Sequence, residues 1–181
     1  VRKVIHNIGF PCVLKIISDT ITHKTEVGGV ITNISTTEEL DQAMRQMKKG
    51  FAMRSVALKG LLVQKMIRGY EMFIGAKRDQ NFGIVLVVGL GGIYAELLKE
   101  VSYRVYPFSY DEFLYMISET KLSKLIRGFR GTGVIDTQKL YDVVMRIGLL
   151  MERFSEIKEI DMNPLMISDK EISAVDCRVI L

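Results

Sequence analysis

Residues 14–30, with the sequence LKIISDTITHKTEVGGV, form the stretch that most limits how this chain can fold. They begin as an apolar strand that contains one lysine, Lys15, and they end at a Gly-Gly pair. A buried ammonium group is costly unless an anion meets it, so this lysine indicates an anionic ligand. Because glycine lets the main chain approach a ligand closely, the N–H groups of Gly28 and Gly29 are suited to a phosphate. The stretch therefore predicts a nucleotide site.

His23 lies in the polar part of the same stretch. An imidazole is largely neutral near pH 7 and can act as a nucleophile toward phosphorus. Lys24 and Glu26 lie close by in the sequence and could steady the ring, the carboxylate by fixing its tautomer. We therefore interpret His23 as a phosphoryl-carrying histidine. Taken alone, the loop is more typical of an exposed histidine that takes part in no chemistry.

The length of 181 residues suits one ordinary domain or two small lobes. No apolar run reaches the ~18 residues that a membrane span needs, so we expect no membrane partner. The net charge of +4 suits phosphorylated ligands, but the basic residues are scattered, which argues against a nucleic-acid partner. Cys12 and Cys177 lack partners at metal spacing, which favours a cytoplasmic protein without disulfides or zinc. The chain does not begin with Met, and we expect an upstream part to be missing.

Apolar periodicity predicts helices and strands that interleave without a regular βαβ rhythm, and hence an α+β fold. Helices are expected at residues 1–8, after the capping-box sequence at residues 36–39 with a stop at Gly50, after a second box at residues 109–112, and after Asp136. Strands are expected at residues 13–17, 30–34, 61–66, 71–78, 84–88, 158–167 and 171–180. In the last helix the residues expected to face the core are Leu140, Val143, Val144, Ile147, Leu150 and Phe154.

Two further stretches have compositions suited to a site. Residues 89–92, GLGG, are expected to form a loop that allows close approach of the main chain. The last two strands are expected to form a hairpin with its turn at residues 169–170, which would place Asn163 opposite Asp176. One amide oxygen and one carboxylate, completed by water and phosphate oxygens, make a reasonable Mg²⁺ shell. A polar strand edge, with Asp161 paired to a cation, explains the same residues equally well.

Taken together, these stretches resemble the ATP-grasp domain of NDP-forming acyl-CoA synthetases, and in particular the beta subunits of ADP-forming acetyl-CoA synthetases. The resemblance covers essentially the whole chain, and its specificity lies in the order and spacing of the pieces. In order, these are GFPCVLKI, HKTEVGGV, the Gly-Tyr-Glu at residues 69–71, NFGIVLVVGLGGIYAELLKEVSYRVYP, GFRG, EIDMNPL and AVDCRVIL. It implies an ATP-grasp fold with lobes at residues 1–66 and 67–181 and a nucleotide between them.

The resemblance also implies cofactors and the residues that bind them. The cofactors are ADP or ATP with Mg²⁺, the latter held by Asn163 and Asp176. His23 matches the phosphohistidine on the nucleotide-binding subunit. The nucleotide would be bound by Lys15 at its phosphates, by Gln64, Met66 and Ile67 at a hinge beside adenine, and by Glu71 at the ribose, together with Gly28 and Gly29.

The implied reaction converts acyl-CoA, ADP and phosphate into a carboxylic acid, ATP and CoA. It would need a CoA-binding alpha partner, in a heterotetramer, that is absent from this chain. A regulatory module that binds nucleotide without turnover is the alternative, and an RNA-binding domain rests only on the basic pI. Glu96 has two equally supported interpretations, a site residue and a solvated charge. For Arg130 we favour a role as a helix cap. Arg104 is left with either Glu100 or Glu96 as its partner.

Overall fold

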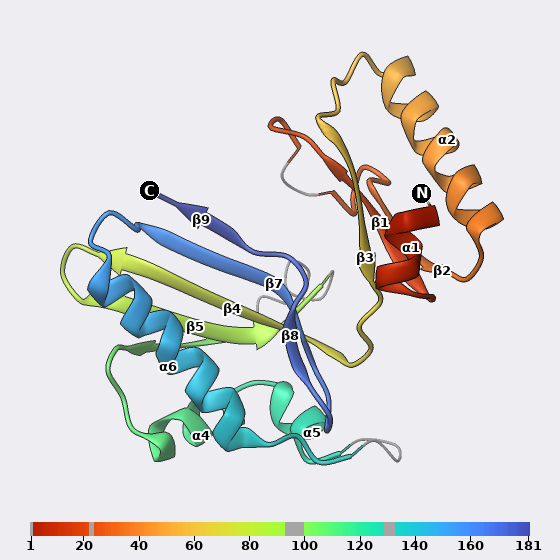
Figure 1. The fold of residues 1–181 in the computed structure, drawn as a ribbon. Coiled ribbons are helices and arrows are strands. Elements are labelled where there is room, and N and C mark those ends of the chain that lie inside the picture. The colour runs from red at the N-terminus through yellow and green to blue at the C-terminus, as the bar shows by residue number, and fades with distance from the viewer. Residues whose placement is uncertain (1, 22–23, 93–99, 129–132) are drawn as a thin grey trace. The chain divides into compact units, whose positions relative to one another are not determined.

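The computed structural model describes residues 2–21, 24–92, 100–128 and 133–181, and at residues 2–4 it describes the main chain alone (Figure 1). The chain divides into two compact units, Val1–Met66 and Ile67–Leu181. Each unit has its own sheet and its own apolar core. His23, Glu96 and Arg130 lie outside the described residues.

Unit 1 is a three-stranded antiparallel sheet with two helices. Its strands β1 (Cys12–Ile17), β2 (Val30–Ile34) and β3 (Gly60–Lys65) have the spatial order β2-β1-β3. Helix α1 spans Arg2–Ile8, and helix α2 spans Thr37–Met53. The core lies between the sheet and these helices and contains Cys12, Leu14, Ile16, Ile34, Leu40, Ala43, Met47 and Phe51.

Helix α2 runs past the glycine at which it was expected to stop. It continues through Gly50 to Met53, so that prediction was wrong. Phe51, four residues after Met47 on the same face, is buried in the core of unit 1. Burial of a phenylalanine side chain contributes roughly 1.5–3 kcal/mol, which exceeds the roughly 1 kcal/mol that a glycine costs inside a helix.

Unit 2 is built on a six-stranded antiparallel sheet of order β6-β5-β4-β7-β8, with β9 paired to β7. Its strands are β4 (Tyr70–Asp79), β5 (Gly83–Leu90), β6 (Val101–Val105), β7 (Glu159–Ile167), β8 (Ile172–Ala174) and β9 (Arg178–Ile180). Helices α4 (Tyr110–Ser118), α5 (Leu122–Ile126) and α6 (Thr137–Arg153) pack against one face of the sheet (Figure 1). Strand β6 and helix α5 were not anticipated from the sequence.

Three helices begin where capping residues predicted. The side chains of Thr36, Ser109 and Asp136 each accept a hydrogen bond from the main-chain N–H three residues later. Such bonds satisfy N–H groups that have no partner inside the helix. The capping box at Ser109 is complete, because the Glu112 carboxylate accepts the Ser109 N–H.

The phase of α6 differs from prediction at its C-terminal end. Met151 is 0% exposed, whereas Leu150 is 40% exposed and Phe154 is 46% exposed. Leu140, Val144 and Ile147 are also buried, so the inward face advances in steps of three and four residues and next reaches 151. The prediction that Leu150 and Phe154 face the core was therefore wrong.

None of the described helices has the length and apolar character that crossing a membrane requires.

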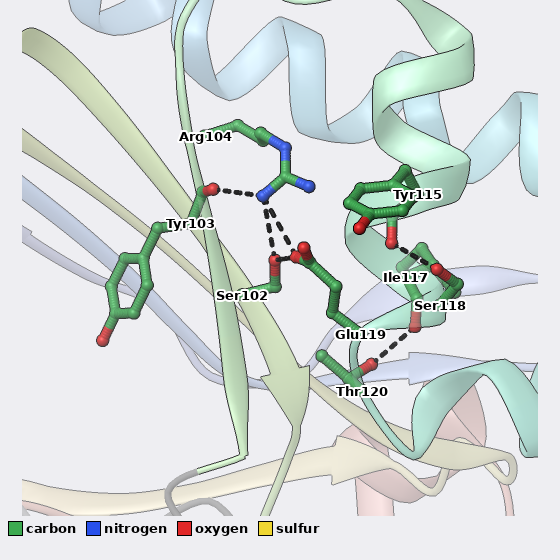
Figure 2. A network of polar contacts seen from close by, with 8 residues as sticks. All are labelled: Ser102, Tyr103, Arg104, Tyr115, Ile117, Ser118, Glu119 and Thr120. Atoms are coloured by element: carbon green, nitrogen blue, oxygen red, sulfur yellow. Dashed lines mark hydrogen bonds and ion pairs between the residues drawn. The ribbon is translucent and has the colours of Figure 1, made fainter.

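Arg104 pairs with an acidic residue that the sequence had not indicated. Its guanidinium lies 3.1 Å from the carboxylate of Glu119, just after α4, and Glu119 also accepts a hydrogen bond from the hydroxyl of Ser102 (Figure 2). Glu100 instead forms an ion pair with Lys121. Ser102 and Arg104 lie two residues apart on β6 and therefore share one face of it. The network fastens the end of α4 to strand β6.

Candidate functional site

Lys15 occupies the central strand of the unit 1 sheet, paired with Val30 on β2 and Leu62 on β3. Its side chain is buried, at 8% exposure, as the sequence predicted. The neighbouring residues Leu14 and Ile16 point into the core, so strand alternation directs Lys15 to the opposite face of the sheet. The structure therefore presents a cation on the face of this sheet that its core does not use.

Gly28 and Gly29 close the turn that leads into β2. The Gly28 N–H donates to the carbonyl of Thr25 over 3.1 Å, and the Gly29 N–H donates to that of Lys24 over 2.7 Å. Gly28 has φ +72°, and a Cβ on Gly29 would lie 2.7 Å from the Ile16 side chain. This corrects the expectation that both N–H groups are available to a phosphate, because the turn itself uses them and explains both glycines.

The expected hinge begins on the last strand of unit 1. Gln64 pairs with Val13, and strand alternation places its side chain on the same sheet face as Lys15. The Gln64 Oε1 is buried, and no hydrogen bond from any described residue reaches it. The Met66 N–H donates to the carbonyl of Pro11 over 3.1 Å, and Ile67 begins the second unit. A buried carbonyl of this kind suits the N–H or O–H group of a ligand.

In unit 2 the glycine-rich stretch approaches two predicted site residues. Gly89 and Leu90 belong to β5, which corrects the expected loop, and the turn starts at Gly91. The Gly91 N–H donates to the main-chain carbonyl of Glu71 over 2.8 Å, and the Gly92 N–H donates to the Asn163 Oδ1 over 2.8 Å. The sequence predicted that the main chain of this stretch approaches another group closely, but it did not indicate Glu71 or Asn163 as that group. The turn thus joins the predicted ribose residue to a predicted metal ligand.

The C-terminal hairpin has the predicted register. Leu165 pairs with Ala174 on β8, and Asp161 pairs with Arg178 on β9, so opposed residue numbers have the same sum in both ladders. The expected single strand at residues 171–180 is interrupted between β8 and β9. Because equal numbers of residues separate the two ladders on each side, Asn163 and Asp176 fall opposite each other at the interruption.

A β-bulge sets which way Asn163 faces. Met72 pairs with Leu165 while Ile74 pairs with Met162, so two residues of β7 stand opposite Phe73 alone. Ile160 and Met162 before the bulge, and Leu165 and Ile167 after it, all pack in the helix-covered core. Asp161 and Asn163 consequently lie on the other face, together with Glu71.

The donors on this face fit a magnesium ion. Asn163 offers an amide oxygen, and Asp161 and Asp176 offer carboxylates. Burial raises the pKa of the Cys177 thiol, and the negative charges of Asp161 and Asp176 raise it further. No cluster of three His, Cys, Asp or Glu residues suited to a metal occurs among the described residues. Oxygen donors in small number suit Mg²⁺, which usually keeps water and phosphate oxygens in its shell.

The same sheet face carries an open concavity of about 570 Å³. Its lining is mainly apolar and includes Phe73, Val85, Val87, Tyr103 and Val105, and Asp161 is one of its polar residues. The described helices of unit 2, α4, α5 and α6, pack on the opposite face, so the core that they form with the sheet lies on the other side from this concavity.

A family model described as an ATP-grasp domain matches residues 1–181. The chain belongs to the ATP-grasp family. This match confirms the α+β ATP-grasp fold expected from the sequence. The cofactors of an ATP-grasp chain are a nucleotide and Mg²⁺, and the donors described above suit these two cofactors.

Several relatives of this ATP-grasp chain are ADP-forming acetate–CoA ligases. It is 38% identical over 177 residues to the beta subunit of acetate–CoA ligase (ADP-forming) I from Pyrococcus furiosus, covering 96% of this chain and 76% of that subunit. It is 35% identical over 183 residues to acetate–CoA ligase (ADP-forming) I from Archaeoglobus fulgidus, covering 99% of this chain but only 27% of that longer protein. The chain therefore belongs with the beta subunits and corresponds to about a quarter of the longer ligase.

Solved structures of one archaeal enzyme share the fold. Dinucleotide-forming acetyl-coenzyme A synthetase 1 from Ca. Korarchaeum cryptofilum, in complex with coenzyme A, Ca-AMPCP and HgCl⁺, has a TM-score of 0.89 and 38% identity over 99% of this chain and 80% of that one. A second complex, with coenzyme A and Mg-AMPPCP, has a TM-score of 0.82 at the same identity and coverage, and its phosphohistidine segment points towards the nucleotide-binding site.

Proposed function

We propose that this ATP-grasp chain is the nucleotide-binding part of an ADP-forming acyl-CoA synthetase, which makes ATP from acyl-CoA, ADP and phosphate. The observation that carries the proposal is the 38% identity along 76% of the P. furiosus beta subunit. Since the chain spans only 27% of the A. fulgidus ligase, the acyl-CoA half of the reaction belongs to sequence outside it. A phosphoryl group would pass from that half to ADP bound here.

Unit 1 supplies the groups that recognise the nucleotide. The buried ammonium of Lys15 neutralises charge on the phosphates, where a fixed cation in a poorly solvated position is most effective. The buried carbonyl of Gln64 accepts a hydrogen bond from the nucleotide. Main-chain groups at Met66 and Ile67 contact adenine. Gly28 and Gly29 contribute by shaping the loop that carries His23.

Unit 2 supplies the ribose contact and the metal ligands. The carboxylate of Glu71 accepts hydrogen bonds from ribose hydroxyls. Asn163 and Asp176 hold Mg²⁺, whose bound form neutralises charge on the phosphate oxygens. The hairpin register and the bulge in β7 support this assignment, because they bring an amide oxygen and carboxylates to one face.

His23 carries the phosphoryl group. A terminal oxygen of ADP attacks phosphorus, the N–P bond of phospho-His23 breaks, and the imidazole nitrogen recovers its lone pair. This assignment rests on the sequence match around His23, which stands between Lys15 and Gly28 in the chain. Transfer of this kind needs positioning and charge neutralisation more than further covalent chemistry from the protein.

A CoA-binding alpha part completes the enzyme, either as a partner subunit or on the same chain. The P. furiosus relative is a subunit, which supports a partner, and the A. fulgidus relative is a longer single protein. We propose a cytoplasmic heterotetramer of two alpha and two beta parts. The acyl group is selected in the alpha part.

Phosphorylation by labelled ATP tests this function. Incubation of the full-length protein with Mg²⁺ and γ-labelled ATP should give label that is acid-labile and base-stable. His23→Ala should abolish the label, whereas His6→Ala should retain it, because His6 is the other histidine of the chain and lies exposed on α1. Equal labelling of His23→Ala and wild type would overturn the assignment of His23 as the phosphoryl carrier. Tight Mg·ADP binding without any label would point instead to a regulatory module.

A further inference from the structure

A side chain at Gly91 would collide with the main chain, and one at Gly92 would displace the Glu71 carboxylate. A Cβ on Gly91 would lie 2.7 Å from the main-chain carbon of Met72 and 2.9 Å from that of Glu71. Gly92 has φ +63°, and a Cβ there would overlap the Oε2 of Glu71. The Glu71 carboxylate therefore occupies the space that a side chain at residue 92 would need.

Gly92 also contacts Asn163 through its main chain. Its N–H donates to the Oδ1 of Asn163 over 2.8 Å. An amide side chain can present either its oxygen or its NH₂ group toward a neighbour, and a main-chain N–H can donate a hydrogen bond only to the oxygen. An amide oxygen has two lone pairs, so one can receive this hydrogen bond while the other faces a cation. The bond thus selects one orientation of the Asn163 amide.

We propose that Gly92 is a positioning residue for both the metal ligand Asn163 and the ribose residue Glu71. It holds the Asn163 oxygen with its N–H and leaves room for the Glu71 carboxylate by having no side chain. The inference rests on the proposed nucleotide function and adds to it a residue that acts through Asn163 and Glu71. Substitution at residue 92 should therefore weaken nucleotide binding and its dependence on Mg²⁺ at the same time.

The variant Gly92→Ala tests the proposal against a matched control, Gly83→Ala. Gly83 has φ +77°, but a Cβ there meets nothing within 4 Å, so the control shares the backbone strain without the contacts. ADP affinity is measured by calorimetry on the full-length protein, with Mg²⁺ and with EDTA. Gly92→Ala should bind ADP about tenfold more weakly in Mg²⁺ and lose most of the gain that Mg²⁺ gives. Gly83→Ala should match wild type in both respects.

A second measurement needs no substitution at residue 92. Amide hydrogen exchange of Gly92 should accelerate about tenfold or more in Asn163→Ala, because the hydrogen-bond acceptor is gone. The Gly91 amide, which is bonded to the Glu71 carbonyl, is the internal control and should keep its rate. An unchanged Gly92 rate would overturn the proposal even if Gly92→Ala failed to fold.

The outcomes separate this inference from the proposed function. If wild type binds Mg·ADP and Gly92→Ala behaves like Gly83→Ala, the positioning role is overturned and the nucleotide function stands. If wild type binds no ADP under any condition, the proposed function fails, and the inference fails with it. If Gly92 acts through Asn163, Gly92→Ala should reduce the effect of Mg²⁺ on ADP affinity in the wild-type background and should have no further effect on it in Asn163→Ala. If Gly92 has a purely structural role, Gly92→Ala should leave the effect of Mg²⁺ unchanged in the wild-type background as well.

Discussion

The guanidinium of Arg104 lies 3.1 Å from the Glu119 carboxylate and 5.5 Å from the centre of the Tyr115 ring (Figure 2). Glu119 is held by this arginine and by the buried hydroxyl of Ser102. The edge strand β6 and the end of helix α4 are therefore joined by charge as well as by apolar packing.

The Glu119 network should weaken in acid. The hydrogen bond from Arg104, followed by that from Ser102, lowers the pKa of Glu119 from its ordinary value of 4.5. A carboxyl whose pKa is lower in the folded state contributes stability above its ordinary pKa and loses it as the pH falls through the folded value. The melting temperature of Glu119→Gln should therefore lie below that of wild type at neutral pH, and the gap should close below about pH 4.5.

Thermal unfolding followed by circular dichroism at a series of pH values measures this gap. A gap between wild type and Glu119→Gln that stays constant into acid would contradict the assignment.

The phase of α6 predicts unequal costs for two neighbouring residues. Met151→Ala should destabilise the protein by roughly 2–5 kcal/mol, because it removes a fully buried side chain and leaves a cavity. Leu150→Ala should cost about 1 kcal/mol or less, since that side chain is 40% exposed. Urea unfolding of both variants provides the comparison. Equal costs would mean that the helix faces the sheet differently.

Nucleotide binding should depend on the charge of Lys15. Lys15→Met keeps an unbranched apolar stem in the sheet and removes the ammonium, so ADP should bind roughly 10- to 100-fold more weakly with little loss of melting temperature. Lys59→Met is the matched control, because Lys59 lies in the same unit in an exposed ion pair with Asp19. Calorimetric titration with ADP distinguishes the two. Equal losses in both variants would indicate a general effect of net charge.

Mg²⁺ should tighten ADP binding only when both metal ligands are present. In wild type, EDTA should lower ADP affinity, whereas in Asn163→Ala and Asp176→Asn the affinities with and without Mg²⁺ should be nearly equal. Asp142→Asn on α6 removes a carboxylate from the helical layer and should retain the Mg²⁺ effect. A full Mg²⁺ effect in either ligand variant would exclude that residue from the metal site.

Local sequence patterns determine much of this fold. Thr36, Ser109 and Asp136 begin helices because a side-chain oxygen can satisfy N–H groups that the first turn leaves free. The hairpin register followed from a turn at residues 169–170, because strand pairing keeps the sum of opposed residue numbers constant. The buried lysine of β1 was equally evident, since its neighbours in the sequence are apolar.

Packing between distant segments decided the rest. Helix α2 continues past Gly50 because Phe51 is buried in the core of unit 1. Arg104 forms an ion pair with Glu119 because α4 ends beside β6.

The sequence by itself determined which residues carry the candidate chemistry, since charge, donor type and spacing are local properties of the chain. Only the tertiary structure decided that the Gly28 and Gly29 N–H groups close a turn and that the Gly92 N–H reaches Asn163. The physical reason is that a main-chain N–H has the same chemistry in every residue but proline, so its partner is set by which segments the fold brings within hydrogen-bonding distance.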